Sequence, residues 1–557
     1  MAHILMAAAP SLLVIISSCS AAAAAAATQQ PRQLPTAVAS VNVTGAASPF
    51  PHYWKRCFGS GHALLGTRVD WRAHLQRARD ELGLAGVRFH GVLDDDMSVT
   101  PDGRSYYFYN VDVVFDNLVA LGITPIVELS FLPRALAHCT PSDCSYAFND
   151  PGSYKGVQGI PRDQNGAPDY GAWYNLVHAF AAHLVERHGL AAIAEWHFEV
   201  WNEMWGVQFP SEYMPLYNAS ARALKAVDAS LRVGGPATMQ TQHLGAFVDA
   251  CARGRVPVDF VSSHLYPSDP NCTTAREGAR DPDCFAHTIA RAAGFVRDAA
   301  ARNGLAPLPF LVTEYKDGLQ GGPGYGGGGP HGDTGYAAAF ITRTVPMLDG
   351  AGADVLSWWT FTDVFEENWL RGVPFYGGFG LLTSQGVAKP AYRAFQLLAG
   401  AGAARVAARV ADPLPPPAGA TAEDYSTVSV LATVADGNGG GGGCARGLQV
   451  FLANFAPMAG ATGAAWTPVA RNVSLRLGGL SSTALRFVLT RVDDTATDPY
   501  AQWEAMGKPQ YLTEAQLATL HAASEPAASV VDVPADGALA LTLPPYGVAH
   551  LKVISCG

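Results

Sequence analysis

Two glutamates stand at the ends of otherwise apolar segments of this 557-residue chain. Glu203 closes the run Trp196–Glu203, and Glu314 lies near the end of Pro309–Tyr315. A carboxylate buried there is costly unless it is paired or hydrogen-bonded. A single glutamate of this kind is more often a structural ion-pair partner than a catalyst. Two of them, one preceded by Asn202 and both flanked by Trp or Tyr, favour catalysis.

A pair of carboxyl groups is what hydrolysis of a glycosidic bond requires, because one donates a proton to the leaving oxygen and the other faces the anomeric carbon. Trp358 and Trp359 fit core packing as well as sugar stacking. A lone histidine such as His264 is typical of a core residue, and Glu128 fits either a structural or a supporting role. The aromatic residues that could stack on a sugar are Trp196, Trp201, Trp205, Tyr266, Trp358 and Trp359, and the hydrogen-bond donors are Arg88, His90, Asn202 and His264.

These residues must be held by regular elements, and short apolar runs alternate with helical patterns between Cys57 and Ala399. Amphipathic spacing from Trp173 to Leu184, closed by Gly189, is typical of the helices. Strands that are apolar on both faces and separated by helices indicate a parallel sheet. Eight such units predict a (β/α)₈ barrel over residues 54–400, with function at the carboxyl ends of its strands. The expected strands are Cys57–Gly61, Val87–Gly91, Pro125–Ser130, Trp196–Glu203, Arg232–Ala237, Asp259–Tyr266, Pro309–Tyr315 and Val355–Phe361.

The composition changes after Pro413–Pro417, where strand patterns dominate. Thr513 is expected to cap a helix that runs to Ala523. Residues 401–557 are therefore predicted to form an antiparallel β-sandwich, and residues 28–53, rich in Ala, Ser and Pro, an irregular lead-in to the barrel. The expected sandwich strands are Val428–Val434, Leu448–Asn454, Asn472–Leu477, Ala484–Val492 and Val548–Ile554.

Composition excludes several classes of protein. Only 15% of residues are charged and 49% are hydrophobic, which excludes a disordered chain. The formal net charge is −10 with no basic patch, so nucleic acid is not expected as a partner. No C-x-x-C or H-E-x-x-H motif occurs, so no metal is expected. The glycines of Gly321–Gly329 lie in low-complexity sequence, which indicates a flexible rim of the site and no cofactor.

The first 27 residues combine an apolar run with small residues, as in a secretory signal peptide. No other segment is long and apolar enough to span a membrane. Eight of the nine cysteines would remain after cleavage, enough for up to four disulfides, with Cys139–Cys144 and Cys272–Cys284 as local pairs. We therefore expect secretion, or delivery to a lytic compartment such as a lysosome or vacuole. The N-x-S/T sequons at Asn42, Asn218, Asn271 and Asn472 agree with export.

Several blocks, in order along the chain, resemble glycoside hydrolase family 39, which contains β-xylosidases and α-L-iduronidases on a retaining (β/α)₈ barrel. Glu199-Val-Trp-Asn-Glu203 resembles the acid/base signature of that family. Arg88-Phe-His-Gly91, followed by Asp94–Ser98, resembles its second-strand block. The further matching blocks are Pro125–Phe131, Val233–Ala237, Asp259–His264, Trp359–Glu367, Pro499–Thr513 and Pro544–Gly547.

The resemblance implies that Glu203 is the general acid/base and Glu314 the nucleophile of a double displacement with retention. The pKa of Glu203 should then rise once Glu314 is ionised nearby. The family usually has proline after the acid/base, whereas this chain has Met204 followed by Trp205, so the aglycone side is not predicted. The other implied site residues are Asn202 for the 2-hydroxyl, His90 for the −1 subsite, Glu367 for the terminal sugar, and His264 with Tyr266 beside the nucleophile. Of the aromatic residues that could stack on a sugar ring, Trp359 is also assigned to the substrate site.

The predicted function is that of a secreted retaining exo-glycosidase whose partner is an oligo- or polysaccharide. Carboxylates in Thr362–Glu367 favour a β-xyloside, because they hold neutral sugars. An α-L-iduronide would need cations for its carboxylate, for which Lys316 and Arg371 are the candidates. The alternatives are an endo-acting mannanase- or cellulase-like hydrolase and a non-catalytic carbohydrate-binding protein on the same fold.

Overall fold

The computed structural model describes residues 36–140, 144–146, 156–273, 281–319, 331–366, 372–414, 426–435, 447–457, 469–479 and 484–556. The chain divides into two compact units, Met1–Leu34 and Pro35–Gly557, and all described residues belong to the second. The predicted signal peptide, the glycine-rich rim, Glu367 and Arg371 lie outside the described residues. The same holds for Cys444 and for the side chain of Cys556.

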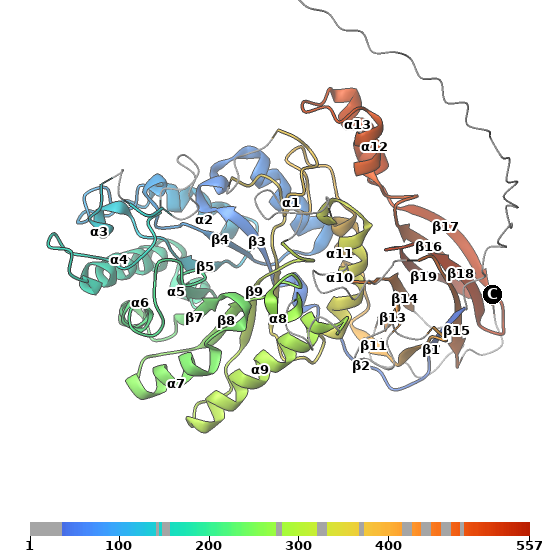
Figure 1. Ribbon diagram of the computed structural model, residues 1–557, viewed down its shortest axis with the longest axis horizontal. Helices are drawn as coiled ribbons and strands as arrows, with labels where there is room; N and C mark the ends of the chain where they lie inside the picture. Colours follow the sequence, from blue (N-terminus) through green and yellow to red (C-terminus); the bar gives the residue numbers. More distant parts are fainter. Residues whose placement is uncertain are drawn as a thin grey trace, which may run out of the picture. The chain divides into compact units, whose positions relative to one another are not determined.

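Eight parallel strands close into a barrel in the order β10-β3-β4-β5-β6-β7-β8-β9. Figure 1 labels β3, β4, β5, β7, β8 and β9 of this barrel among the surrounding helices. Nearly all residues of the strands are buried, because side chains fill the barrel on one face and helices cover the other. Each predicted strand overlaps an observed one, and the predicted barrel is confirmed. The strands are β3 (Cys57–His62), β4 (Val87–His90), β5 (Ile126–Leu129), β6 (His197–Val200), β7 (Arg232–Thr238), β8 (Phe260–His264), β9 (Phe310–Tyr315) and β10 (Val355–Trp358).

Helices surround the barrel, and α4 (Tyr170–His188) shows why they form. Its buried residues, among them Trp173, Phe180 and Leu184, recur every three or four positions. The carboxylate of Asp169 accepts the N–H of Ala172 at its start. The other α-helices around the barrel are α1 (Val69–Leu82), α2 (Tyr109–Ala120), α3 (Arg134–Ala137), α5 (Leu190–Ile193), α6 (Tyr213–Val227), α7 (Leu244–Gly254), α8 (Pro270–Thr273), α9 (Cys284–Arg302), α10 (Gly335–Met347) and α11 (Pro390–Ala399). Short 3₁₀ helices are η1 (Tyr53–Lys55), η2 (Ala63–Thr67), η3 (Asp95–Met97), η4 (Met239–Thr241) and η6 (His331–Asp333).

A β-sandwich follows the barrel in the chain, and it confirms the predicted second architecture. One sheet has the order β12-β1-β15-β18 and the other β17-β16-β19-β14-β13-β11-β2. Neighbouring strands are antiparallel except for β1 and β15. The strands are β1 (Ala37–Asn42), β2 (Ser48–Pro49), β11 (Ala404–Val406), β12 (Ala408–Ala411), β13 (Val428–Val434), β14 (Gln449–Asn454), β15 (Arg471–Gly478), β16 (Leu485–Val492), β17 (Ala527–Val533), β18 (Ala538–Leu543) and β19 (Val548–Cys556).

The segment predicted as an irregular lead-in contributes β1 and β2 to the two sheets of the sandwich. In β1, Ala37, Ala39 and Val41 are buried, while Val38 and Ser40 are partly exposed. Alanine and serine carry little hydrophobic contrast, so this period-two alternation is weak in the sequence. The sandwich is thus built from segments that precede the barrel in the sequence and segments that follow it.

The helical hairpin of α12 (Pro499–Ala505) and α13 (Glu514–Ala523) packs on the segment that follows β10. Trp503 and Leu520 of the hairpin share a buried apolar cluster with Phe375 and Val387. Thr513 caps α13 as predicted, with reciprocal hydrogen bonds to Gln516.

Both predicted local disulfides are present, Cys139–Cys144 and Cys272–Cys284. Cys57 and Cys251 are buried free thiols. The eight cysteines therefore do not form the four disulfides that were expected as the upper limit. Among the described helices, none combines the length and the apolar character needed to cross a membrane.

Candidate active site

The two predicted glutamates meet at the carboxyl ends of the barrel strands. Glu203 follows β6, the fourth strand of the barrel in chain order, and Glu314 lies in β9, the seventh. One oxygen of each carboxyl group and one ring nitrogen of His264 lie within 4.8 Å of one another. Residues that are far apart in the sequence thus form one cluster, as the sequence predicted.

Glu314 is held by hydrogen bonds on both of its oxygens. Arg88 Nη1 donates to Oε1 over 2.7 Å, and the Tyr266 hydroxyl donates to Oε2 over 2.8 Å. His90 Nε2 lies 3.8 Å from Oε1. The carboxylate is therefore fixed in orientation, with its charge balanced by a guanidinium.

Arg88 is fully buried and organises the floor of the site. Its Nε donates to Glu199 over 2.6 Å, and its Nη2 contacts Glu128 over 2.5 Å and Asn202 Oδ1 over 2.9 Å. Burial alone would lower the pKa of Arg88, but Glu128, Glu199 and Glu314 outweigh it and raise that pKa well above its usual value. The positive charge is thus retained by three carboxylates.

Glu199 is a supporting residue that was not among the predicted site residues. It is fully buried in β6, where Arg88 binds Oε2 and the Thr313 hydroxyl donates to Oε1 over 2.8 Å. Glu128, left open by the sequence, has the same kind of role beside His90, whose Nδ1 lies 2.8 Å from its Oε2. Burial alone would raise the pKa of Glu128. Arg88 and His90 lower this pKa by more than burial raises it, so it lies below its usual value.

The backbone around Glu203 has an unusual conformation. Trp201, Glu203 and Met204 have φ values of 71°, 50° and 58°, a left-handed conformation that costs energy in residues other than glycine and is common at functional sites. The Glu203 N–H donates to the carbonyl of Ala237 over 2.8 Å. Proline is locked near φ −65°, so this turn excludes the proline that the family usually has in place of Met204.

Burial shapes the proton affinity of Glu203. Its side chain is 14% exposed, and burial raises its pKa to about 7 despite the opposing charges of His90 and Arg88. This rise was expected from the charge of Glu314, but burial is its main cause. Glu203 therefore keeps a proton up to neutral pH, as a general acid must.

His264 lies closer to Glu203 than to Glu314, the partner that the family resemblance implied. Its Nδ1 is 2.7 Å from Glu203 Oε1 and 3.5 Å from Glu314 Oε2. Burial lowers the pKa of His264 to about 4, so the ring is neutral at neutral pH. A protonated Glu203 then donates its O–H to Nδ1.

Of the aromatic residues that were expected to stack on a sugar, some lie at the site and others lie in the core. Trp359 lies beside His90, with ring centroids 4.9 Å apart, and packs with Phe365 and Phe379. A Cβ at Gly59 would lie 2.3 Å from the Trp359 ring, so β3 needs glycine there. Trp358 instead packs in the core against Phe395, and Trp196 stacks on Phe115, so neither of these two lies at the site.

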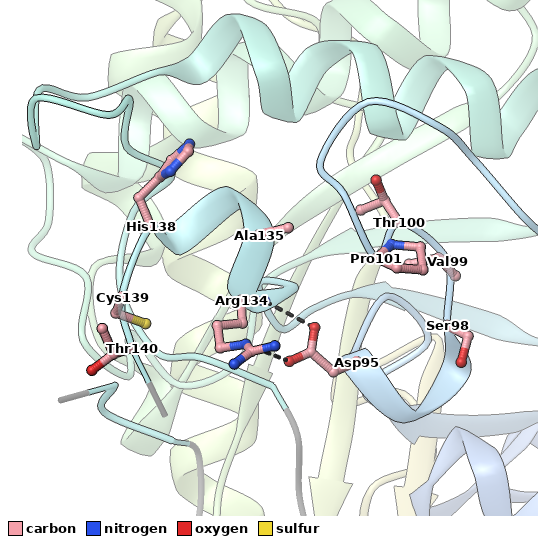
Figure 2. A pocket seen from close by; sticks show the side chains of 10 residues that line it. All are labelled: Asp95, Ser98, Val99, Thr100, Pro101, Arg134, Ala135, His138, Cys139 and Thr140. Carbon is pink, nitrogen blue, oxygen red and sulfur yellow. Dashed lines mark hydrogen bonds and ion pairs between the residues drawn. The ribbon is translucent and has the colours of Figure 1, made fainter. Parts of the chain in front are cut away.

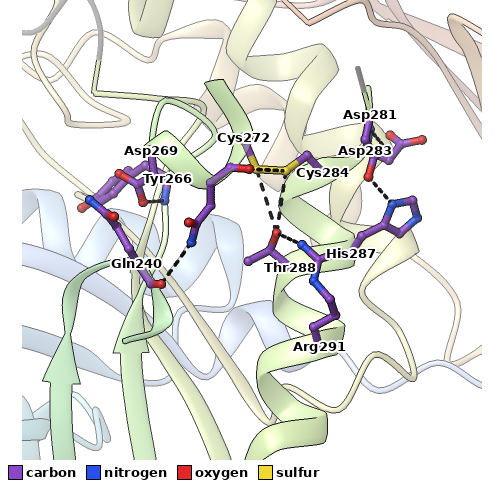
Figure 3. Close-up of a disulfide and its surroundings, with 11 residues drawn as sticks. Gln240, Tyr266, Asp269, Cys272, Asp281, Asp283, Cys284, His287, Thr288 and Arg291 are labelled. Carbon is purple, nitrogen blue, oxygen red and sulfur yellow. Dashed lines mark hydrogen bonds and ion pairs between the residues drawn. A yellow bond between two sulfur atoms is a disulfide. The ribbon is translucent and has the colours of Figure 1, made fainter. Parts of the chain in front are cut away.

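The loop after β8 positions Tyr266 (Figure 3). Asp269 Oδ2 accepts the Tyr266 N–H over 2.8 Å, and burial raises the pKa of Asp269 to about 7. The Cys272 N–H donates to the carbonyl of Asp269, and the disulfide to Cys284 ties this loop to the start of α9. The hydrogen-bond donor to Glu314 is thus anchored by a covalent link.

A separate pocket of about 470 Å³ opens beside Cys139, between the loops after β4 and β5 (Figure 2). Asp95 accepts the backbone N–H of Arg134 there over 3.0 Å. None of the predicted site residues lines this pocket, so it is distinct from the glutamate cluster. Its lining residues are Asp95, Ser98, Val99, Thr100, Pro101, Arg134, Ala135, His138, Cys139 and Thr140.

A closed (β/α)₈ barrel with one buried, proton-holding glutamate and a second, ion-paired glutamate at its strand ends has the equipment of a glycoside hydrolase. Comparison with known proteins agrees with this class. The model of the glycosyl hydrolases family 39 matches residues 38–540, and the chain belongs to that family. It is a glycoside hydrolase, and its substrate is a carbohydrate.

Within the family, the chain is similar to individual β-xylosidases and, over a shorter stretch, to an α-L-iduronidase. A β-xylosidase of Caldicellulosiruptor saccharolyticus is 34% identical over 488 residues, covering 85% of this chain and 88% of the relative. The α-L-iduronidase of Homo sapiens is 28% identical over 163 residues, which cover 28% of this chain and 21% of that enzyme. The crystal structure of a monomeric β-xylosidase from Caulobacter crescentus superimposes with a TM-score of 0.72 at 26% identity, covering 93% of this chain and 99% of that one.

Proposed function

We propose that the protein is a retaining, exo-acting β-xylosidase in which Glu203 is the general acid/base and Glu314 the nucleophile. The observation that carries this proposal is the short distance between the two carboxyl groups, because one oxygen of Glu203 lies within 4.8 Å of one oxygen of Glu314. Retaining enzymes hold these groups about 5–5.5 Å apart, whereas inverting enzymes leave about 6.5–9.5 Å for a water molecule.

In the first step, a Glu314 oxygen bonds to the anomeric carbon while the Glu203 proton passes to the departing glycosidic oxygen. In the second step, Glu203, now ionised, takes a proton from water, and that water oxygen displaces Glu314. Arg88 and Tyr266 hold the nucleophile for both steps through the hydrogen bonds described above. Two inversions at one carbon leave its configuration unchanged.

The surroundings of Lys316 favour a neutral sugar over a uronide. Its Nζ lies 2.5 Å from Asp317 Oδ1 and its side chain is buried, over the ring of Trp358. A lysine already neutralised in this way is a poor partner for the carboxylate of a uronide. The longer match to a β-xylosidase than to an α-L-iduronidase supports the same choice.

We also propose that the protein acts in an exported or lytic compartment. Two disulfides support this, because such bridges persist in oxidising compartments. Fractionation of expressing cells, with N-terminal sequencing of the exported product, tests it; a product that stays in the cytosol with an intact N-terminus would contradict it.

The activity is tested by release of p-nitrophenol from the β-xyloside, α-L-arabinoside and α-L-iduronide. We expect the β-xyloside to be hydrolysed fastest, with activity lost in Glu314→Ala and kept in Glu186→Ala, which removes an exposed glutamate of α4. Proton NMR should show β-xylose as the first product. Equal inertness of wild type and Glu314→Ala on all three substrates would contradict the proposal, and α-xylose as first product would contradict retention.

A further inference from the structure

Three charged side chains that the steps above do not use meet in the interior of the protein. They are Asp333 of η6, Asp363 of the segment after β10, and Lys389, which directly precedes α11. Lys389 Nζ lies 2.7 Å from Asp333 Oδ1 and 2.7 Å from Asp363 Oδ2, and all three side chains are fully buried. Burial alone would lower the pKa of Lys389, but the two carboxylates raise it above its usual value. The lysine is therefore charged, and the three residues form a buried ion triad.

Each member of the triad binds one main-chain group of the short segment 377–380. The two carboxylates accept N–H groups, and the ammonium donates to a carbonyl. A segment held at three of its four residues has little freedom to move. The three hydrogen bonds run from the Gly377 N–H to Asp333 Oδ2 (2.8 Å), from the Gly380 N–H to Asp363 Oδ1 (2.6 Å) and from Lys389 Nζ to the Gly378 carbonyl (3.1 Å).

Glycine on either side of Phe379 makes room for Asp363. A Cβ at Gly378 would lie 2.4 Å from Asp363 Oδ1, and one at Gly380 would lie 2.2 Å from the Asp363 backbone nitrogen. Both distances are shorter than van der Waals contact, so glycine is needed at both positions. The Thr360 N–H also donates to the carbonyl of Phe379 over 3.0 Å. The position of Phe379 is thus fixed by the triad and by the chain that follows β10.

The ring of Phe379 connects the triad to the substrate site. It packs on Phe365 with ring centroids 5.5 Å apart, and Phe365 packs on Trp359 with centroids 5.9 Å apart. The three rings form one buried cluster, and Trp359 lies in turn beside His90. Close-packed interiors transmit small shifts, so a displacement of Phe379 moves the ring of Trp359.

Taking the site as that of the proposed β-xylosidase, we propose that Asp333, Asp363 and Lys389 are positioning residues that set the position of Trp359 at the substrate site. Stability alone does not explain such a triad, because well-packed apolar side chains in place of buried ion pairs are often at least as stable. Directional hydrogen bonds to three main-chain groups, in contrast, select one conformation of the segment that carries Phe379. The triad therefore acts on sugar binding, and the two glutamates keep their own supports.

The test is Asp363→Ala, which removes the acceptor for the Gly380 N–H and leaves Lys389 paired with Asp333. The ring of Trp359 serves the sugar before and during bond cleavage, so its displacement raises KM more than it lowers kcat. We expect KM for p-nitrophenyl β-xyloside to rise at least about threefold, with kcat within about twofold of wild type. The dissociation constant of xylose, measured by titration calorimetry, should rise by the same factor as KM.

The matched control is Asp493→Ala in the sandwich. Asp493 is also buried, and its Oδ1 accepts the N–H of Thr495 over 2.9 Å. Loss of this acceptor should lower the melting temperature while KM and the xylose constant stay at their wild-type values. A purely structural role of Asp363 would give the same pattern in Asp363→Ala.

A folded Asp363→Ala with wild-type KM and xylose constant, or with a fall in kcat alone, overturns the proposal. Should this variant fail to fold, Phe379→Leu decides, because it keeps the triad and loses the ring contact with Phe365. Both constants should then rise at least about twofold, and wild-type values would count against the proposal. A wild-type enzyme that binds xylose but is inert on the xyloside overturns the proposed function instead, and the xylose constants still test the triad.

Discussion

Replacing Glu203 by glutamine should stabilise the protein at alkaline pH while it removes the proposed acid catalyst. Burial raises the pKa of Glu203 from 4.5 to about 7. In the folded protein the neutral form is favoured, so ionising Glu203 costs free energy that the unfolded chain does not incur. The cost is absent below the unfolded pKa and complete above the folded one.

The size of this effect follows from the pKa shift. A rise from 4.5 to about 7 corresponds to about 3 kcal/mol of stability lost above neutral pH. Glutamine never ionises, and its amide can donate to His264 Nδ1, which lies 2.7 Å from Oε1 of Glu203. The variant should therefore melt like the wild type below pH 4.5 and about 3 °C higher above neutral pH, given the unfolding entropy of a chain of this size.

Scanning calorimetry of wild type and Glu203→Gln across this pH range is the assay, with Glu186→Gln as the control for loss of an exposed glutamate. The control should show no such pH dependence. A melting difference between Glu203→Gln and wild type that stays constant with pH, or favours the wild type at alkaline pH, would show that the pKa of Glu203 is not raised in the folded protein. On xylobiose the variant should lose about 10²–10⁴-fold in kcat/KM.

Three further predictions concern the supports of the site. Met204→Pro, which installs the residue usual in the family, should lower kcat/KM on xylobiose at least about tenfold, because φ at this position is 58°; unchanged or improved kinetics would show that the turn adapts. Gly59→Ala should raise KM for p-nitrophenyl β-xyloside several-fold by displacing Trp359, whose ring lies 2.3 Å from the added Cβ position; wild-type KM and kcat together would contradict this. Cys272→Ser with Cys284→Ser should lower the free energy of unfolding by about 3 kcal/mol, measured by urea titration under conditions that keep the other disulfide intact; an unchanged midpoint and slope would count against a stabilising role for this bridge.

The barrel could be predicted because its strands are buried on both faces and therefore read as apolar runs. The same contrast exposed Glu203 and Glu314, since a carboxylate is conspicuous in such a run. Strand β1 was not predicted, because alanine and serine alternate there with little difference in hydrophobicity.

The sequence did not reveal which side chains share the interior of the barrel. Arg88 and Glu199 are 111 positions apart and meet only when the barrel closes. Trp358 and Trp359 are adjacent in sequence but point to opposite faces, one toward the helices and one toward the site. The pKa of Glu203 likewise depends on burial by elements that the sequence places far from it.

The most direct test of the central claim is to trap the covalent intermediate with a 2-deoxy-2-fluoro-β-xyloside that has a good leaving group, and to locate the label by mass spectrometry of peptides. Double displacement through Glu314 predicts a single fluoroxylosyl ester on that residue, in a burst that inactivates the enzyme. A label on Glu203, or an enzyme that turns over β-xylosides and never forms an ester, would contradict it.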